Sequence, residues 1–380
     1  MNKTNPNSFT AIVGFICLFQ LLPMLGLVVG ATAATPALLK AKQDAEAKSY
    51  SFETARDEIL AKARKERRLR ALSSLEGPTI KAMADAFRSE YPFLNVHVEE
   101  LTGSDANQRF VLEMKAGRAS NWDVAHMATD LYNDYHPFLK KFDLFGMAQQ
   151  SVLRVPTQLI DPVNRNIIAS TSALQVVAYN KKLLSAEKVP ETWEDFLKPE
   201  FKGQKFVADI RPTEIAALVP AWGLEKTIDF ARRLGAQQPV WVRGGSRMVT
   251  AIILGEYALF IGPNYHTIKR AQTKDPAGVL DFKIVEPVPT RLSDAAAVLT
   301  AAPNPYAGLL WLEFLGSPRG QKIAEDTEPF AASIFVPGFA QEQITRGKKL
   351  SVVDWNHFAK MPEYQTKVVE AYGFPKAERK

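Results

Sequence analysis

The amino-acid sequence predicts an α/β protein built as two lobes. A chain of 380 residues is longer than a single hydrophobic core usually requires, which favours two domains or lobes. Between residues 69 and 142, short apolar strands alternate with segments of helical spacing, and this alternation indicates parallel βα units. The first set of units ends near residue 172, and an apolar segment at 294–299 returns to it. A second lobe therefore lies between these two points.

Each element of the first lobe follows from its local pattern. Residues 35–66 are rich in good helix formers and form a helical lead-in. Strands are expected at 69–72, 95–101 and 122–127; in the second, Val96 and Val98 alternate with polar residues. Helical segments are expected at 78–91, from Ser104 as N-cap to 117, and at 130–142.

The second lobe has a less regular pattern. We expect strands at 172–179, 206–208, 240–242, 258–261 and 281–285, and helices at 193–197 (after an N-cap at Thr192), 213–222 and 225–234. After a Gly-Gly-Ser turn, a further helix should end at Gly255. The strand at 258–261 is followed by a loop that presents Tyr265 and His266.

These elements predict the division of the chain. We expect lobe 1 to comprise residues 67–171 and 292–345, and lobe 2 to comprise 172–291. Asn304-Pro305 and Ser317-Pro318 are N-cap and N1-proline pairs that start two helices of lobe 1. The pattern does not assign the tail, residues 346–380, to either lobe.

The N-terminus indicates export. Lys3 precedes an apolar run at 11–30 that ends in Ala31-Thr32-Ala33, the pattern of a signal peptide over 1–34 cleaved near Ala33 or Ala34. An uncleaved anchor is the alternative, because the run is long for a signal. Export places the protein in the periplasm. Cys17 lies within the run, so the cleaved chain has no cysteine for a disulfide or a thiolate metal site.

Charge and motifs exclude several classes of protein. The net charge of +6 comes from 47 basic and 41 acidic residues, and its even spread argues against a nucleic-acid-binding protein. The sequence contains no Gly-x-Ser-x-Gly elbow, no P-loop and no dinucleotide fingerprint. These features favour a binding protein over an enzyme.

Residues that suit an anion lie at predicted strand ends, where ligand sites of open α/β sheets form. Arginines can bind a carboxylate or phosphate in a bidentate manner, and glycine-rich turns direct backbone N–H groups at anions. The candidate ligand-binding residues are Ser73, Ser74, Glu76, Ser104, Asp130, Arg211, Arg243, Gly244, Ser246, Asn264, Tyr265 and His266.

Several segments between residues 61 and 338 carry a family resemblance, among them VPETWEDFLKPEFKGQKFVAD, LGEYALFIGPNYH and NPYAGLLWLEFLGSPRGQKIAED. In these segments the chain resembles periplasmic solute-binding proteins of ABC importers with the type II fold, most closely the ferric-iron-binding branch. The resemblance implies two lobes, each a mixed sheet flanked by helices, joined by hinge strands and closing on a solute. It also implies a monomer that delivers its solute to permease subunits in the membrane.

The resemblance leaves the solute open between ferric iron and an organic anion. The branch's two adjacent tyrosines correspond here to Tyr265 and His266, and its first-lobe ligands fall near Glu76 and Asp130. Ferric iron prefers anionic oxygen ligands, so the histidine lowers the charge available for it. Iron would be the cargo, and no cofactor is required. A sensor that docks on a signalling partner and an exported enzyme of the same fold are the alternative functions.

Overall fold

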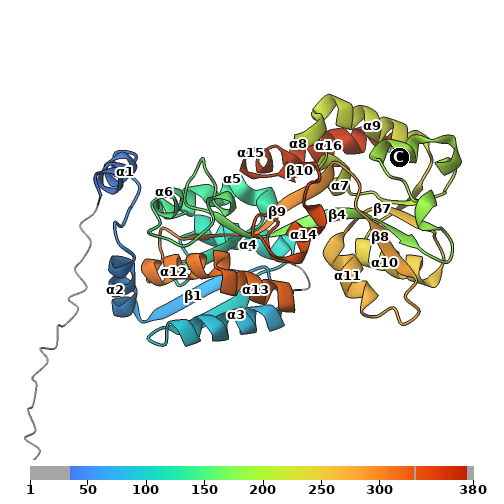
Figure 1. The fold of residues 1–380 in the computed structure, drawn as a ribbon. Coiled ribbons are helices and arrows are strands. Elements are labelled where there is room, and N and C mark those ends of the chain that lie inside the picture. The colour runs from blue at the N-terminus through green and yellow to red at the C-terminus, as the bar shows by residue number, and fades with distance from the viewer. Residues whose placement is uncertain (1–34, 329–330, 375–380) are drawn as a thin grey trace, which may run out of the picture.

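The computed structural model describes residues 35–328 and 331–374. Two lobes lie side by side and are joined by long strands (Figure 1). The predicted signal peptide, residues 1–34, lies outside the described residues. Within the described ranges, no helix has the length and apolar character needed to cross a membrane.

Parallel strands form the sheet of the first lobe, as predicted. β1 (Arg68–Ser73) pairs in parallel with β2 (Asn95–Glu100) and β3 (Val124–Met127). The alternation of Val96 and Val98 with exposed residues gives β2 one face toward the core. The lobe's helices are α1 (Pro36–Glu46), α2 (Arg56–Glu66), α3 (Gly77–Glu90), α4 (Ser104–Lys115), α5 (Tyr132–Tyr135), α6 (Leu144–Gln149), α12 (Pro305–Gly316) and α13 (Pro318–Thr327).

Helix starts in this lobe confirm one predicted cap and correct another. The Ser317 hydroxyl accepts a hydrogen bond from the Gly320 amide, so Ser317 caps α13 as predicted. Asn304 precedes α12, but its side chain makes no capping bond. Its amide nitrogen instead donates to the buried Asp123 carboxylate, which draws the side chain away from the helix.

The second lobe has its own sheet. β5 (Val207–Asp209) lies in parallel between β6 (Val240–Val242) and β7 (Leu259–Asn264), and β8 (Leu280–Lys283) pairs with β4 (Ile168–Asn180). The Thr192 cap is confirmed: it forms a reciprocal capping box with Asp195 at a short 3-10 helix. The surrounding helices are α7 (Thr213–Ala216), α8 (Val219–Trp222), α9 (Leu224–Ala236), α10 (Gly245–Leu254) and α11 (Tyr265–Gln272).

Two long strands connect the lobes. β4 is buried throughout; residues 168–174 pair with β9 (Val288–Val298), and its later residues pair with β7 and β8. β9 also continues into the first sheet, where it runs antiparallel to β3. β4 therefore belongs to both sheets, whereas β9 pairs with β3, β4 and β10, and the β4–β9 pairing joins the lobes. The exact lobe boundaries stay a prediction.

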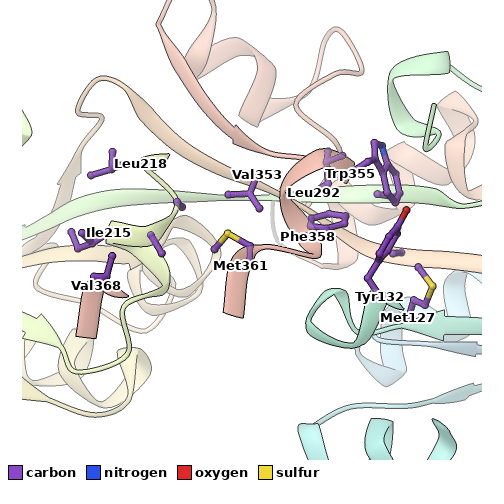
Figure 2. Close-up of a cluster of buried hydrophobic side chains, with 14 of the residues drawn as sticks. Met127, Tyr132, Ile215, Leu218, Leu292, Val353, Trp355, Phe358, Met361 and Val368 are labelled. Atoms are coloured by element: carbon purple, nitrogen blue, oxygen red, sulfur yellow. The ribbon is translucent and has the colours of Figure 1, made fainter. Parts of the chain in front are cut away.

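The C-terminal segment returns to the junction of the lobes. After α14 (Ala340–Thr345), β10 (Leu350–Val353) pairs with β9, followed by α15 (Trp355–Phe358) and α16 (Met361–Tyr372). Figure 2 shows Phe358 and Met361 between Tyr132 of one lobe and Ile215 of the other, and Trp355 belongs to the same hydrophobic cluster. α16 packs on α7 and α9. The tail thus covers one side of the junction with apolar contacts.

Candidate solute-binding cleft

Two adjoining cavities form a cleft at the junction of the lobes. One has a volume of about 540 Å³ and is lined mainly by lobe 2; the other has about 450 Å³ and is lined by both lobes. We call them the inner and the interlobe compartments. Asn264, Thr267 and Arg291 line both, so the compartments are continuous. The inner compartment is further lined by Gln175, Asp209, Arg211, Pro212, Thr213, Glu214, Gly245, Ser246, Phe260, Gly262, Pro263 and Gln365.

A glycine turn places the start of α10 at the inner compartment. Gly244 has φ of 106°, a conformation that side chains rarely adopt, and its amide donates to Asp209 Oδ2 at 3.4 Å. Gly245 and Ser246, the first residues of α10, line the cavity. The first amides of a helix lack partners within it, so this end of α10 suits an anion.

Arg211 lies at the same compartment, held by the end of β5. Asp209 Oδ1 accepts hydrogen bonds from the Arg211 amide at 2.9 Å and Nε at 3.2 Å, and Oδ2 accepts from Nη2 at 2.7 Å. One carboxylate therefore orients the guanidinium and the Gly244 amide. Arg211 and Ser246, both predicted ligand residues, therefore line the same compartment.

Asn264 and His266 lie where the two compartments meet. Asn264 Oδ1 accepts a hydrogen bond from the His266 amide at 2.9 Å and lies 2.8 Å from its Nδ1. His266 Nε2 lies 3.2 Å from Gln341 Nε2. Asn264 thereby caps α11 and sets the imidazole orientation, and His266 faces the interlobe compartment.

The predicted loop that presents Tyr265 is wrong, because Tyr265 is the first residue of α11. Its ring is buried and packs edge-on against Phe282 at 5.3 Å, within a hydrophobic cluster of lobe 2. Burial, with a contribution from Glu325, raises the pKa of the phenol to about 12. Tyr265 lines neither compartment, whereas Glu76 and His266 line the interlobe one. Among the described residues, no group of three His, Cys, Asp or Glu side chains is placed to hold a metal.

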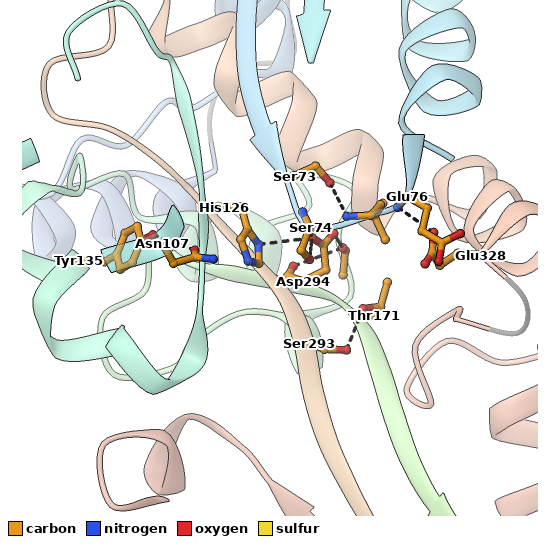
Figure 3. A network of polar contacts seen from close by, with 12 residues as sticks. Ser73, Ser74, Glu76, Asn107, His126, Tyr135, Thr171, Ser293, Asp294 and Glu328 are labelled. Carbon is orange, nitrogen blue, oxygen red and sulfur yellow. Dashed lines mark hydrogen bonds and ion pairs between the residues drawn. The ribbon is translucent and has the colours of Figure 1, made fainter. Parts of the chain in front are cut away.

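Ser73, the last residue of β1, and Ser74, which follows it, make polar contacts at the junction (Figure 3). The Ser74 hydroxyl donates to Asp294 Oδ1 at 2.9 Å, and the Ser170 hydroxyl donates to Oδ2 at 2.8 Å. His126 Nδ1 is 3.5 Å from Asp294 Oδ1, close enough for an ion pair but without hydrogen-bond geometry. Ser73 is buried, and its hydroxyl accepts from the Leu75 amide at 3.2 Å. Of the two predicted serines, Ser74 lines the interlobe compartment.

Other predicted residues lie elsewhere. Arg243 lines a separate cavity of about 510 Å³ together with Arg247, so the two arginines that flank the glycine turn do not face the cleft. The predicted ligand residue Gly244 lines neither compartment; its amide donates a hydrogen bond to Asp209, which lines the inner compartment. Ser104 is the first residue of α4, and Gly103 occupies the N-cap position predicted for Ser104. Asp130 lies in a 3-10 turn. The side chains of Ser104 and Asp130 lie outside the described part of the structure, and their roles as ligands stay predictions.

Sequence reasoning missed several residues of the cleft, among them Gln175, Glu214, Thr267, Arg270, Arg291, Asp294 and Glu328. Arg291 and Asp294 lie inside β9, away from any turn or strand end. Only the pairing of β9 with β4 at the junction places these two residues in the cleft, and a local sequence pattern does not show that pairing.

Residues 127–361 match the family model of the bacterial extracellular solute-binding proteins. The chain belongs to this family. A match over this length, on a two-lobe fold with a cleft at the junction, makes the chain a solute-binding protein and confirms the predicted class. The family consists of binding proteins that act outside the cytoplasm.

Solved structures show the same fold. A Trichodesmium protein (IdiA, FutA) in complex with iron and citrate is 18% identical; the match covers 80% of this chain and 98% of that one, with a TM-score of 0.63. The apo ferric ion-binding protein A of Pasteurella haemolytica is 20% identical over 82% of this chain and all (100%) of that one, with a TM-score of 0.62. The substrate-binding protein of an Agrobacterium tumefaciens ABC transporter is 21% identical over 81% and 97%, with a TM-score of 0.57. The predicted two-lobe type II fold is therefore confirmed.

An ion pair crosses the cleft of this solute-binding protein. Arg270 of α11 lies 2.8 Å from Glu76 Oε1, at the start of α3, and 3.7 Å from Glu328 Oε1, after α13. Glu328 Oε2 also accepts from the Glu76 amide at 3.0 Å and the Thr79 hydroxyl at 2.8 Å. The two carboxylates come from lobe 1 and the guanidinium from lobe 2, so the contact favours the closed arrangement.

Arg270→Ala is expected to shift the protein toward an open arrangement. The pair is partly exposed, so it contributes at most about 1 kcal/mol, or up to about fivefold in the open-to-closed ratio. Distances between spin labels at Lys81 of α3 and Lys274 after α11 measure the populations. Arg319→Ala is the matched control, because Arg319 pairs with Glu90 at 3.6 Å within lobe 1. Equal label distances in both variants would show that Arg270 does not hold the lobes together.

Proposed function

We propose that this protein is the exported receptor of an ABC importer and closes its two lobes on a small organic anion. The observation that carries the proposal is the inner compartment, where Arg211, Arg291 and the N-terminal end of α10 line one cavity. Two guanidinium groups and the first amides of α10, which have no partner within the helix, supply donors to a carboxylate or phosphate group. Hinge closure would bring lobe 1 over the bound solute.

Each compartment would bind a different part of the solute. The inner compartment would bind the anionic group, because Asp209 already orients Arg211 and the Gly244 amide there. The interlobe compartment, with Ser74, Glu76 and His266, would contact the remainder of the solute. Asn264 and Arg291, which line both, would contact the solute where the compartments meet.

Ferric iron carried together with an organic anion is the second candidate. Glu76 and His266 line the same compartment, and the similar Trichodesmium protein binds iron with citrate. Since Tyr265 is buried in the core, an anion held by the arginines would have to supply most of the oxygen ligands. The iron would be cargo, bound only for transport.

We propose cleavage near Ala33 or Ala34, a periplasmic location, a monomeric receptor and delivery to the permease subunits of an ABC transporter. The similar Agrobacterium protein serves an ABC transporter. A signalling partner in place of the permease is the alternative that genomic neighbours would distinguish.

Thermal shift with a ligand panel tests the solute class. The mature chain, purified without chelator, is mixed with citrate, ferric citrate, ferric chloride, succinate, phosphate, sulfate and neutral sugars. Stabilisation by anions without iron supports the organic-anion receptor, since a ligand that binds only the folded state raises the melting temperature. Stabilisation by ferric citrate but not by citrate supports the iron receptor. Stabilisation by neutral sugars alone would refute both.

A further inference from the structure

An acidic side chain lies in the wall of the inner compartment. Glu214, in α7, lines the cavity, although only 6% of the residue is exposed. It packs against Gly262 of β7, where an added Cβ would lie 2.3 Å from Glu214 Cγ. Gly262 also has φ of 78°, so the backbone there favours glycine and leaves the space that Glu214 fills. The packing against Gly262 therefore fixes the Glu214 side chain in the wall of the cleft.

The surroundings of Glu214 favour its protonated form. Arg211, the adjacent cation, forms its ion pair with Asp209 at 2.7 Å. Burial raises the pKa of Glu214 well above its ordinary value; the Asp209 charge raises it further, and the Glu214 amide and Arg211 offset this only in part. A buried carboxyl beside a second carboxylate loses its proton with difficulty.

The other elements packed against α7 add little charge. α16 brings Tyr372, whose own pKa is raised well above its ordinary value by burial and by the charges of Glu214 and Asp209. β7 contains no titratable side chain, and the buried positions of α9 are Thr227, Phe230, Ala231 and Leu234. The charges that act on Glu214 are thus those of Asp209 and Arg211.

We propose that Glu214 is a neutral carboxylic acid in the wall of the cleft and donates a hydrogen bond to the anionic group of the solute. This inference rests on the proposed function and names a specificity-determining residue for it. A protonated carboxyl is a donor, whereas an ionised one only accepts and repels an anion. The solute therefore binds the receptor in which Glu214 holds its proton, and binding weakens as pH rises.

The first measurement needs no ligand. Infrared spectra of the mature protein at pH 7 are compared with Glu214→Gln, and Glu225→Gln is the matched control because Glu225 is an exposed acid at the start of α9. We expect the carbonyl stretch of a protonated acid in wild type and in Glu225→Gln, and its loss in Glu214→Gln. In wild type, the loss of this band as pH rises follows the ionisation of the acid that Glu214→Gln identifies. Absence of the band from wild type overturns the proposal.

The second measurement uses sulfate, whose charge is constant from pH 6 to 9. We expect the affinity of wild type to fall by about tenfold for each pH unit above the pKa of Glu214, and that of Glu214→Gln to change little. Equal pH dependence in both proteins overturns the role of Glu214. A missing acid band in a protein that binds sulfate refutes Glu214 alone. An acid band in a protein that binds neither sulfate nor any other anion of the panel at any pH counts against the proposed anion function and this role together.

Discussion

Asp294→Ala is expected to lower the free energy of unfolding by about 3 kcal/mol. The carboxylate accepts hydrogen bonds from the Ser74 and Ser170 hydroxyls, and His126 lies beside it, so its removal leaves the buried Ser170 and His126 and the half-buried Ser74 without this partner. Asp294 also has φ of 48°, where alanine is strained. Urea unfolding with an unchanged slope measures the loss.

Two variants act as controls for this prediction. Asp294→Asn keeps an acceptor and tolerates the positive φ, so we expect a loss of about 1 kcal/mol. Asp326→Ala removes an exposed partner of Lys322 and should change stability by less than about 0.5 kcal/mol. If Asp294→Ala costs no more than Asp326→Ala, the network does not stabilise the junction.

The pH dependence gives a second readout of the same network. Burial alone would raise the pKa of Asp294, but His126 and the hydrogen bonds from Ser170 and Ser74 lower it below its ordinary 3.8. A lowered pKa means that the stabilisation is present above pH 3.8 and is lost as pH falls through the folded-state pKa. Asp294→Asn should therefore lose less stability on acidification than wild type does.

Arg291→Ala is expected to weaken binding of the best-bound anion of the panel by about 10- to 100-fold, the equivalent of one lost charge-assisted hydrogen bond. Arg291 lies in β9, opposite Ala173 of β4 and Val353 of β10. It lines both compartments, so a solute that occupies either one meets its guanidinium. Isothermal titration of the mature protein measures the change.

Arg243→Ala is the matched control for Arg291. Arg243 was itself a predicted ligand residue, but it lines a separate cavity, so its loss should change the affinity by less than about twofold. The melting temperatures of the free variants show whether either substitution destabilises the fold. If Arg243→Ala weakens binding as much as Arg291→Ala, the anion binds outside the cleft described above.

The regular part of the first lobe could be predicted from sequence because its signals are local. The period-two pattern of Val96 and Val98 and the helical spacing before and after it place β1, α3 and β2 close to their observed bounds. Ser317 with Pro318 predicts the start of α13 for the same reason: a cap depends on residues within one turn.

Tyr265 and His266 show where local reasoning failed. The sequence correctly indicates the end of a strand, but not that Asn264 caps a helix there. Once α11 begins at Tyr265, its helical direction turns the phenol into the core against Phe282 and leaves His266 toward the cleft. Two adjacent residues thus have opposite environments, which only the packed helix determines.

The sequence by itself determined the α/β class, the succession of strands and helices and the family, because these depend on short-range periodicity and on segments that resemble known relatives. The tertiary structure alone decided which side chains meet in the cleft. Glu214 lies far along the chain from Arg291 and Asp294, and the pairing of β4, β7 and β9 places all three in the wall of one cleft. Strand pairing over such separations leaves no mark in local sequence, so the solute site could be read only from the folded chain.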